Sequence, residues 1–423
     1  MMPLGALLNL SIQSLINRRL TVVLTVFAIA VSVLLILGVE KVRHDAKLSF
    51  ANTISGTDLI VGARSGSIQL LLYSVFRIGN ATNNISWKSY QSIAKRKDVK
   101  WTIPISLGDS HRGFRVMGTS ETYFLHYRYA QKRKLKFQAG RPFTDVFETV
   151  LGAEVAKSLG YKLGDEIVID HGIGAAGFIK HEDKPFVASG ILAPTGTPVD
   201  RTIHVSLEGI TAIHVDWRGG APIPGMAVGA EAVRNMDLTP KSITAFMVGL
   251  ESRLSAFRVL RDVNAFSGEP LLAILPGVAL QELWGVIGTA ETALSAVAIM
   301  VVVGGLIGMV TMLLASLSER RREMAILRAV GARPLYVGIM FLAEAILIAG
   351  FGCLMGLLSF YLGMTILQPM IETHLGLFVP IVPPMPREWL ILGLVMIAST
   401  VAGLAPALMA YRQSLADGMT VRY

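Results

Sequence analysis

The chain has 423 residues, of which 52% are hydrophobic and only 16% are charged, and its mean hydropathy is +0.54. Soluble globular proteins carry about 25% charged residues, so this composition excludes an ordinary soluble protein and indicates membrane spans beside a sizeable extramembrane domain. The formal net charge of +9 comes without a nucleic-acid recognition motif, so we expect no nucleic-acid partner.

Residues 1–19 precede the first apolar run, and their apolar side chains recur at helical spacing. We therefore expect an amphipathic helix on the inner leaflet, with the N-terminus in the cytoplasm. Residues 20–39 contain no charge. At a rise of about 1.5 Å per residue they cover about 30 Å, the thickness of the hydrocarbon core. This run is too long for a secretory signal peptide, so it predicts a retained first span.

Residues 40–292 are predicted to form one large extracytoplasmic domain of mixed α/β structure. Strands are expected at 57–61, 101–107, 113–117, 166–170, 243–250 and 271–275, and helices at 86–95, 149–163 and 252–264. The stretch from about 120 to 225 is predicted to be an inserted subdomain. Segments 40–52 and 278–289 are predicted stalk helices that continue spans one and two. The one cysteine, Cys353, lies in an apolar run, so no intrachain disulfide stabilises the domain.

Three further spans are predicted at 293–317, 336–367 and 389–411. They leave a cytoplasmic loop at 318–335, an extracytoplasmic loop at 368–388 and a cytoplasmic tail at 412–423. Arginine gathers in the N-terminal flank, in the loop at 318–335 and in the tail, whereas the loop at 368–388 holds one, Arg387. The positive-inside rule therefore predicts four spans with both termini in the cytoplasm.

The sequence contains no GxxxxGK[ST] motif, so we expect ATP and Mg²⁺ to bind a separate chain and no cofactor to bind this one. The GxGxxG pattern at 172–177 follows a predicted strand, but no helix begins there, so we interpret it as a hairpin loop. Five neighbouring residues could ligate a transition metal, but their spacing is also typical of surface loops: Asp170, His171, His181, Glu182 and Asp183. We assign no metal ligand and no catalytic residue from the sequence.

The segment SERRREMAILRAVGARP at 318–334 begins where the second span leaves the membrane. Met324, Ile326, Leu327 and Val330 are expected to give a short helix one apolar face, with Gly331 ending the helix. Such a helix can dock in a groove of a cytoplasmic partner. The residues predicted to make this contact are Arg320, Arg321, Arg322, Glu323, Met324, Ile326, Leu327, Arg328, Gly331 and Arg333. The alternative is a topological arginine cluster, which would not need an apolar face.

Several positions inside the spans are predicted to have structural roles. Glu344 is costly in a membrane, so it indicates either an interhelical or coupling contact near the inner surface or an ion relay. Small residues at GxxxG spacing predict close helix packing, within the chain or across a dimer seam. The predicted packing positions are Gly304, Gly308, Gly352, Gly356 and Pro406.

Three groups of motifs resemble the FtsX-like permease family, the type VII ABC transporters that include MacB and the lipoprotein-release permeases. ERRREMAILRAVGA at 319–332 is similar to the family signature, and FLAEA at 341–345 and GLAPA at 403–407 are similar to its later spans. GTDLIVG at 56–62, LGAEVAK at 151–157 and GILAPTGTPVD at 190–200 resemble the MacB-like periplasmic core. The likeness covers nearly the whole chain.

This resemblance implies a non-catalytic permease homodimer in the bacterial inner membrane, with its large domain in the periplasm. It also implies two copies of a separate cytoplasmic ATPase, and a periplasmic adaptor or binding protein is a further possible partner. Family members couple ATP hydrolysis to movement of the periplasmic domain, for efflux or lipoprotein release. Two functions stay open: export or extraction of a hydrophobic or lipidated cargo, and regulation of a periplasmic enzyme or binding protein, with a metal-linked system as a variant.

Overall fold

The computed structural model describes residues 4–172, 179–218, 221–222, 228–329, 332–375 and 381–412. They fall into two units. The helical unit comprises Met1–Asp45, Gly288–Ile371 and Val379–Tyr423, and the α/β unit comprises Ala46–Ile287 and Glu372–Phe378. Two long helices, α2 (Arg19–Thr53) and α10 (Pro276–Glu319), supply residues to both units.

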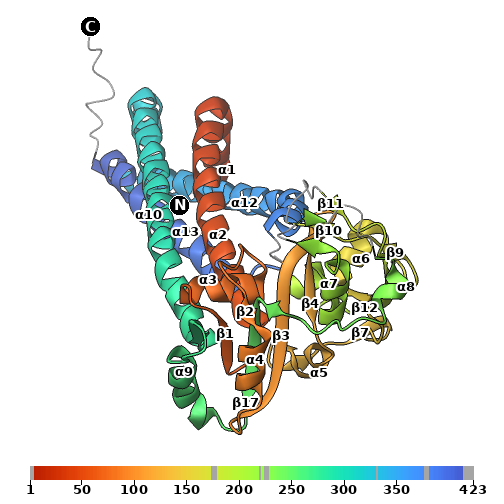
Figure 1. The fold of residues 1–423 in the computed structure, drawn as a ribbon. Helices are drawn as coiled ribbons and strands as arrows, with labels where there is room; N and C mark the ends of the chain where they lie inside the picture. Colours follow the sequence, from red (N-terminus) through yellow and green to blue (C-terminus); the bar gives the residue numbers. More distant parts are fainter. Residues whose placement is uncertain are drawn as a thin grey trace. The chain divides into compact units, whose positions relative to one another are not determined.

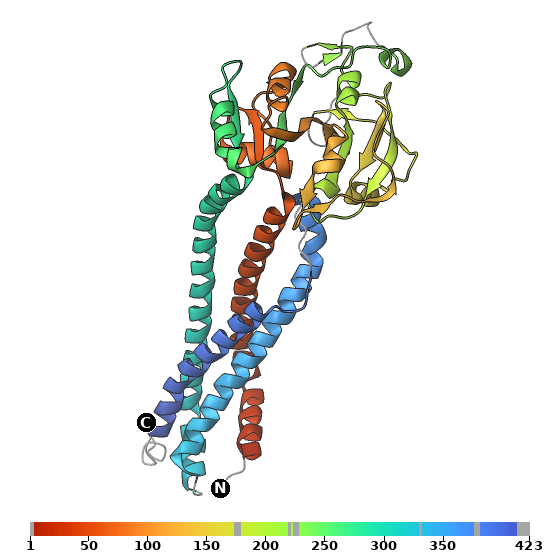
Figure 2. The same ribbon diagram turned by 90° about the horizontal axis from the view of Figure 1, so that it is seen from below.

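The helical unit is built from long apolar helices (Figure 2). Besides α2 and α10 it contains α1 (Leu4–Asn17), α11 (Arg321–Ala329), α12 (Pro334–Leu375) and α13 (Pro386–Arg412). Four segments are long and apolar enough to cross a membrane: Arg19–Lys41, Pro276–Glu319, Pro334–Gln368 and Pro386–Arg412. Together with the α/β unit, which is inserted between the first and second of these helices, they confirm the predicted fold class.

The four long helices share one apolar core. Val33 of α2, Leu313 of α10 and Phe341 of α12 are fully buried in it. The opposite sides of the same helices are also apolar, because residues such as Phe27, Ile307 and Leu362 are more than half exposed. Helices that are apolar all round are suited to a lipid solvent.

Glycines allow close contact between α12 and α2. A Cβ atom built at Gly356 would lie 2.7 Å from Val33 Cβ and 2.8 Å from Ala30 O, and one at Gly352 would lie 2.7 Å from Ile29 Cβ. Built Cβ atoms at Gly304 and Gly308 of α10 have nothing within 4 Å among the described residues. The GxxxG pair of α12 therefore packs within the chain, whereas the pair of α10 faces open space.

Helix α13 packs against α12 at a further glycine. A Cβ atom at Gly403 would lie 2.6 Å from Ala345 Cβ of α12. Pro406 lies one turn further along α13 and is buried. Small residues thus bring α13 close to α12 as well.

We expect Gly356→Ala and Gly363→Ala, both in α12, to change stability with opposite signs. No described atom lies within 4 Å of a Cβ at Gly363, so alanine there should gain up to about 1 kcal/mol of helix propensity. At Gly356 the clash with α2 should outweigh that gain and cost about 1–3 kcal/mol. Thermal unfolding of the two purified variants in the same detergent measures both changes. Equal stabilisation of both would contradict the close contact.

The α/β unit is organised around one twelve-stranded mixed sheet (Figure 1), whose main path runs β18-β1-β17-β3-β4-β13-β8-β12-β7. The pairs β4–β13 and β8–β12 are parallel, and the other pairs are antiparallel. These strands are β1 (Leu59–Ala63), β3 (Val99–His111), β4 (Phe114–Thr119), β7 (Phe137–Gly140), β8 (Glu148–Leu151), β12 (Phe186–Leu192), β13 (Thr202–Ser206), β17 (Ala245–Leu250) and β18 (Leu271–Ile274).

Short strands complete the unit. In the same sheet β9 (Glu166–Ile167) pairs with β12, and β10 (Asp170–His171) pairs with β3 and with β11 (Ile179–Lys180). Two-stranded ladders join β2 (Ile85–Ser86) to β16 (Ser242–Ile243), β5 (Arg128–Tyr129) to β6 (Arg133–Lys134), and β14 (Trp217–Arg218) to β15 (Ala221–Pro222).

The helices of the α/β unit are short. They are α3 (Ser67–Leu71), η1 (Leu72–Phe76), α4 (Trp87–Ala94), α5 (Thr122–His126), α6 (Ala153–Leu159), η2 (Pro198–Arg201), α7 (Leu207–Ile213), α8 (Ala230–Val233), η3 (Arg253–Ser255) and α9 (Ala256–Asn264). Helix α4 begins where its cap predicts, because Ser86 Oγ accepts a hydrogen bond from Ser89 N at 3.2 Å.

Two predicted elements have different boundaries in the structure. The helix expected at 149–163 is wrong at both ends, since Glu148–Leu151 is strand β8 and α6 ends at Leu159. Gly160 follows with φ of 73°, a left-handed conformation that ends helices readily. The strand expected at 166–170 is split into β9 and β10. The stretch 120–225 supplies most of an apolar core around Phe186, but Phe114 and Val116 of β4 belong to the same core, and the strands of the stretch continue the main sheet.

Candidate functional site

The segment predicted to couple to an ATPase begins at a break between two helices. Helix α10 ends at Glu319 and α11 begins at Arg321, with Arg320 as the turn between them. Arg320 N donates to Ser316 O at 3.1 Å, and Met324 N donates to Arg320 O at 3.0 Å. Helical hydrogen bonding therefore continues through the break, so α11 is tied directly to the end of α10.

The Arg320 side chain joins three helices of the helical unit. Its Nη1 lies 3.1 Å from Glu344 Oε1 of α12 and donates to Ser14 Oγ of α1 at 2.6 Å. Its Nε donates to Glu323 Oε2 of α11 at 2.8 Å. Glu344 is only 1% exposed, and a buried carboxylate needs such a partner. This arrangement, named here the Arg320 link, has a geometry that depends on the positions of α1, α11 and α12.

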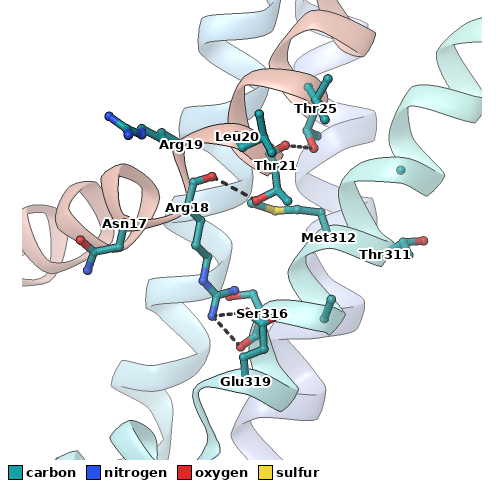
Figure 3. Close-up of a pocket in the computed structure, with 13 residues that line it drawn as sticks. Asn17, Arg18, Arg19, Leu20, Thr21, Thr25, Thr311, Met312, Ser316 and Glu319 are labelled. Atoms are coloured by element: carbon teal, nitrogen blue, oxygen red, sulfur yellow. Dashed lines mark hydrogen bonds and ion pairs between the residues drawn. The ribbon is translucent and has the colours of Figure 1, made fainter.

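A second arginine connects the start of α2 to the end of α10 (Figure 3). Arg18 Nη2 lies 2.9 Å from Glu319 Oε2 and donates a hydrogen bond to Ser316 O at 3.5 Å. The side chain of Arg19 points away from Ser316 and Glu319. These residues line an open cavity of about 730 Å³, whose wall also includes Gly308 and Met312 of α10. The cavity combines an apolar wall with an ion pair at one end.

Met324 and Ile326, the two residues of the expected apolar face whose side chains the structure describes, lie on different sides of α11. Met324 and Ala325 are buried in the core of the helical unit, whereas Ile326 is 56% exposed. A helix turns about 100° per residue, so Met324 and Ile326 point about 200° apart. Met324 holds α11 against the other helices, and Ile326 remains available to a partner.

The other predicted contact residues are placed as follows. Arg322, Glu323 and Arg333 are exposed. The side chains of Arg321, Leu327 and Arg328 lie outside the described residues, although their backbone is part of α11. Val330 and Gly331 lie outside the described residues altogether.

Sequence reasoning missed two residues of this site. From the sequence, Arg18 counts only as one of the arginines of the N-terminal flank, and Ser14 has no predicted contact. No local sequence pattern indicates that Arg18 contacts the end of α10 or that Ser14 contacts Arg320, because each contact joins residues about 300 positions apart.

Two family models together cover most of the chain. The MacB-like periplasmic core domain matches residues 21–246, and the FtsX-like permease C-terminal domain matches residues 295–415. A comparison with curated protein sequences finds no significant match.

Two solved structures have limited similarity to the chain. The periplasmic region of MacB from Actinobacillus actinomycetemcomitans is 13% identical, with a TM-score of 0.33, and the match covers 55% of this chain and 94% of that one. The extracellular domain of the noncanonic ABC-type transporter YknZ from Gram-positive bacteria is also 13% identical, with a TM-score of 0.31. That match covers 51% of this chain and 98% of the YknZ domain.

The family model of the periplasmic core alone matches more than half of the chain, and the permease model matches the last three long helices with the segment at 318–334. Arg320, Glu323 and Glu344 lie within this second match, whereas Ser14, which Arg320 also contacts, precedes both matches. The chain therefore belongs to the MacB/FtsX-like family of ABC transporter permeases.

Proposed function

We propose that this permease transmits ATP-driven movement from a separate cytoplasmic ATPase to its own periplasmic domain. The observation that carries the proposal is the Arg320 link. Helix α11, which exposes Arg322 and Ile326, begins one residue after Arg320, and the Arg320 side chain contacts α1, α11 and α12. A force applied to α11 would therefore reach the membrane helices through short polar contacts.

The long helices α2 and α10 support this function. Each continues without a break from the helical unit into residues of the α/β unit. Arg43 Nε of α2 lies 3.4 Å from Glu291 Oε2 of α10, and Arg387 Nε of α13 lies 2.7 Å from Glu40 Oε1 of α2. Continuous helices transmit tilt and rotation, whereas a flexible connection absorbs them.

The proposed assembly is a homodimer with two ATPase copies, which would bind ATP and Mg²⁺. Gly304 and Gly308 support a dimer seam on α10, since no described atom lies within 4 Å of a Cβ placed at either position. Both termini and α11 would lie in the cytoplasm, as the arginine distribution favours. A periplasmic adaptor or binding protein would act on the α/β unit.

The first candidate output is export or extraction of a hydrophobic or lipidated cargo. Regulation of a periplasmic protein is the second. It is favoured by a cavity of about 470 Å³ in the α/β unit, whose lining is largely polar and includes Asn80, Asn83, Asn84 and Arg115. Such a lining suits a polar ligand or peptide better than an acyl chain.

Mechanical transmission can be tested without knowing the cargo. In a Cys353→Ala background, a spin label at Leu254→Cys, a position 94% exposed in the α/β unit, would report the distance between the two copies. We expect that distance to change between the nucleotide-free and the ATP–vanadate states of the complex in nanodiscs. Flexible Gly-Ser insertions after Asn52 and before Val278 should remove the change and preserve ATP hydrolysis.

The matched control carries the same Gly-Ser insertion in the exposed turn at 267–268, between α9 and β18, and should keep the distance change. If the variants with insertions after Asn52 and before Val278 also keep the distance change, α2 and α10 do not transmit the movement. A label distance that never responds to nucleotide would contradict transmission altogether.

A further inference from the structure

Four potential metal ligands from three separate parts of the α/β unit converge. Asp109 lies in β3, His171 in β10, His181 directly after β11, and His214 at the end of α7. One ligand atom from each of the four lies within 4.8 Å of the others. None of these residues belongs to the coupling site.

The sheet register brings the first pair together. His171 lies directly opposite Asp109 in the antiparallel β10–β3 pair, so their side chains project to the same face. His171 Nδ1 is 3.2 Å from Asp109 Oδ1. Asp170, the neighbour of His171 on the same strand, points to the opposite face and is not a member of the cluster.

The other two histidines close the cluster. His214 Nε2 lies 3.0 Å from His171 Nδ1 and 3.6 Å from Asp109 Oδ1. Ligand atoms about 2.0–2.2 Å from a tetrahedral zinc ion lie about 3.3–3.5 Å apart. Three of the separations in the cluster are therefore close to those of a zinc site, and a small inward movement of His181 would complete it.

The His214 ring is oriented for metal binding. Its Nδ1 donates to Ile210 O at 2.8 Å, so in the neutral ring Nε2 carries the lone pair and faces His171 and Asp109. Metal-binding histidines commonly donate a hydrogen bond from the N–H of the second ring nitrogen to a carbonyl in this way. That hydrogen bond fixes the tautomer and the ring orientation.

His181 is buried without a hydrogen-bond partner for Nε2 among the described residues, and it is 1% exposed. An unpaired polar atom in such a position is costly unless something binds it. Trp217 packs within 4.8 Å of both His171 and His181, measured between ring centroids, and shields the cluster.

We propose that Asp109, His171, His181 and His214 form a binding site for one divalent transition-metal ion, with zinc as the best match. Three imidazoles and one carboxylate are a donor set that zinc accepts in tetrahedral geometry. The set contains no thiolate and too few oxygen atoms for calcium or magnesium. The site would hold β3, the β10–β11 hairpin and the end of α7 together.

The nearby acidic residues have other roles. Asp183 accepts a hydrogen bond from Lys184 Nζ at 2.7 Å, and the same Nζ donates to Asp216 at 2.8 Å. Glu182 is exposed. Of the five neighbouring residues noted in the sequence, the structure thus gathers His171 and His181, and it adds Asp109 and His214 from a distance.

Zinc binding can be measured on the full-length protein in detergent, purified with a histidine-free affinity tag and stripped with a chelator. Calorimetric titration with Zn²⁺ should give one site per chain, and Co²⁺ should give the visible absorption of a tetrahedral complex. Asp109→Asn and His214→Ala should each weaken zinc binding at least about tenfold, since even second-shell changes have effects of that size. His126→Ala, which removes a histidine outside the cluster, should bind zinc like the wild type.

Thermal unfolding in the presence of chelator keeps the test independent of folding defects. All three variants should then unfold at the temperature of the metal-free wild type, and zinc should raise that temperature only for the wild type and His126→Ala. The proposal is overturned if the wild type binds no zinc. It is also overturned if the single variants Asp109→Asn and His214→Ala both bind zinc with the affinity of the wild type. Because no ATPase is present in these measurements, their outcome is separate from that of the transmission experiment.

Discussion

Replacing Ile326 with aspartate is expected to abolish permease-dependent ATP hydrolysis while the protein still inserts and folds. Ile326 is 56% exposed on α11, so a charge there costs little in the isolated permease. In a complex the same charge would have to be desolvated inside an apolar groove of the ATPase, where a central apolar anchor contributes about 2 kcal/mol or more. We expect binding to weaken by roughly 30-fold or more. Titration of the ATPase against the variant in nanodiscs measures this change.

Two control variants separate docking from general effects of charge. Ile326→Leu keeps an apolar anchor and should retain most stimulation. Leu254→Asp places the same charge at an exposed position of the α/β unit and should behave like the wild type. Full stimulation by Ile326→Asp would show that this side of α11 makes no contact with the ATPase, and the arginines of 318–334 would then be only topological signals.

The architecture could be predicted because its signals are local. Uncharged runs such as 20–39 indicate spans by length alone, and Ser86 indicates the start of α4 through its cap. Strand β8 was missed because Glu148–Leu151 is a short segment directly before a helix, with only two apolar residues, and so short a segment does not distinguish strand from helix. The pairing of β8 with both β12 and β13 decides its conformation.

The two sites could be predicted only in part, because each depends on distant contacts. The segment at 318–334 indicated a docking helix, but the division between buried Met324 and exposed Ile326 follows from packing of Met324 in the core of the helical unit. The metal cluster was hidden for the same reason. His171 and His181 are close in the sequence, but the register of β3 supplies Asp109, and the end of α7 supplies His214.

The second large effect is expected from Glu344→Gln. This change removes the carboxylate that Arg320 contacts at 3.1 Å. Glu344 is 1% exposed and the Arg320 side chain is 13% exposed, so the variant would remove the buried counterion of Arg320 and leave only the exposed Glu323 beside it. Breaking such a pair costs about 3–5 kcal/mol. At about 2–4 °C per kcal/mol, the unfolding temperature should fall by on the order of 10 °C.

The chain provides both a probe and a matched control for this measurement. Cys353 is the one cysteine and is buried in the core of the helical unit, so its reaction with a thiol-specific fluorophore reports unfolding of that unit. Glu323 contacts the same arginine at 2.8 Å, but its side chain is 64% exposed. Glu323→Gln should therefore cost less than about 1 kcal/mol, as exposed pairs do.

A double variant distinguishes the lost pair from a general intolerance of substitution at the site. Arg320→Met with Glu344→Met removes both charges together and should recover much of the stability that Glu344→Gln loses, because no buried charge is left alone. The same double variant should still lack coupling, since the polar contact between α11 and α12 is gone. If Glu344→Gln unfolds at the wild-type temperature, the pair is not a structural link, and movement of α11 must reach α12 through the apolar packing of Met324 instead.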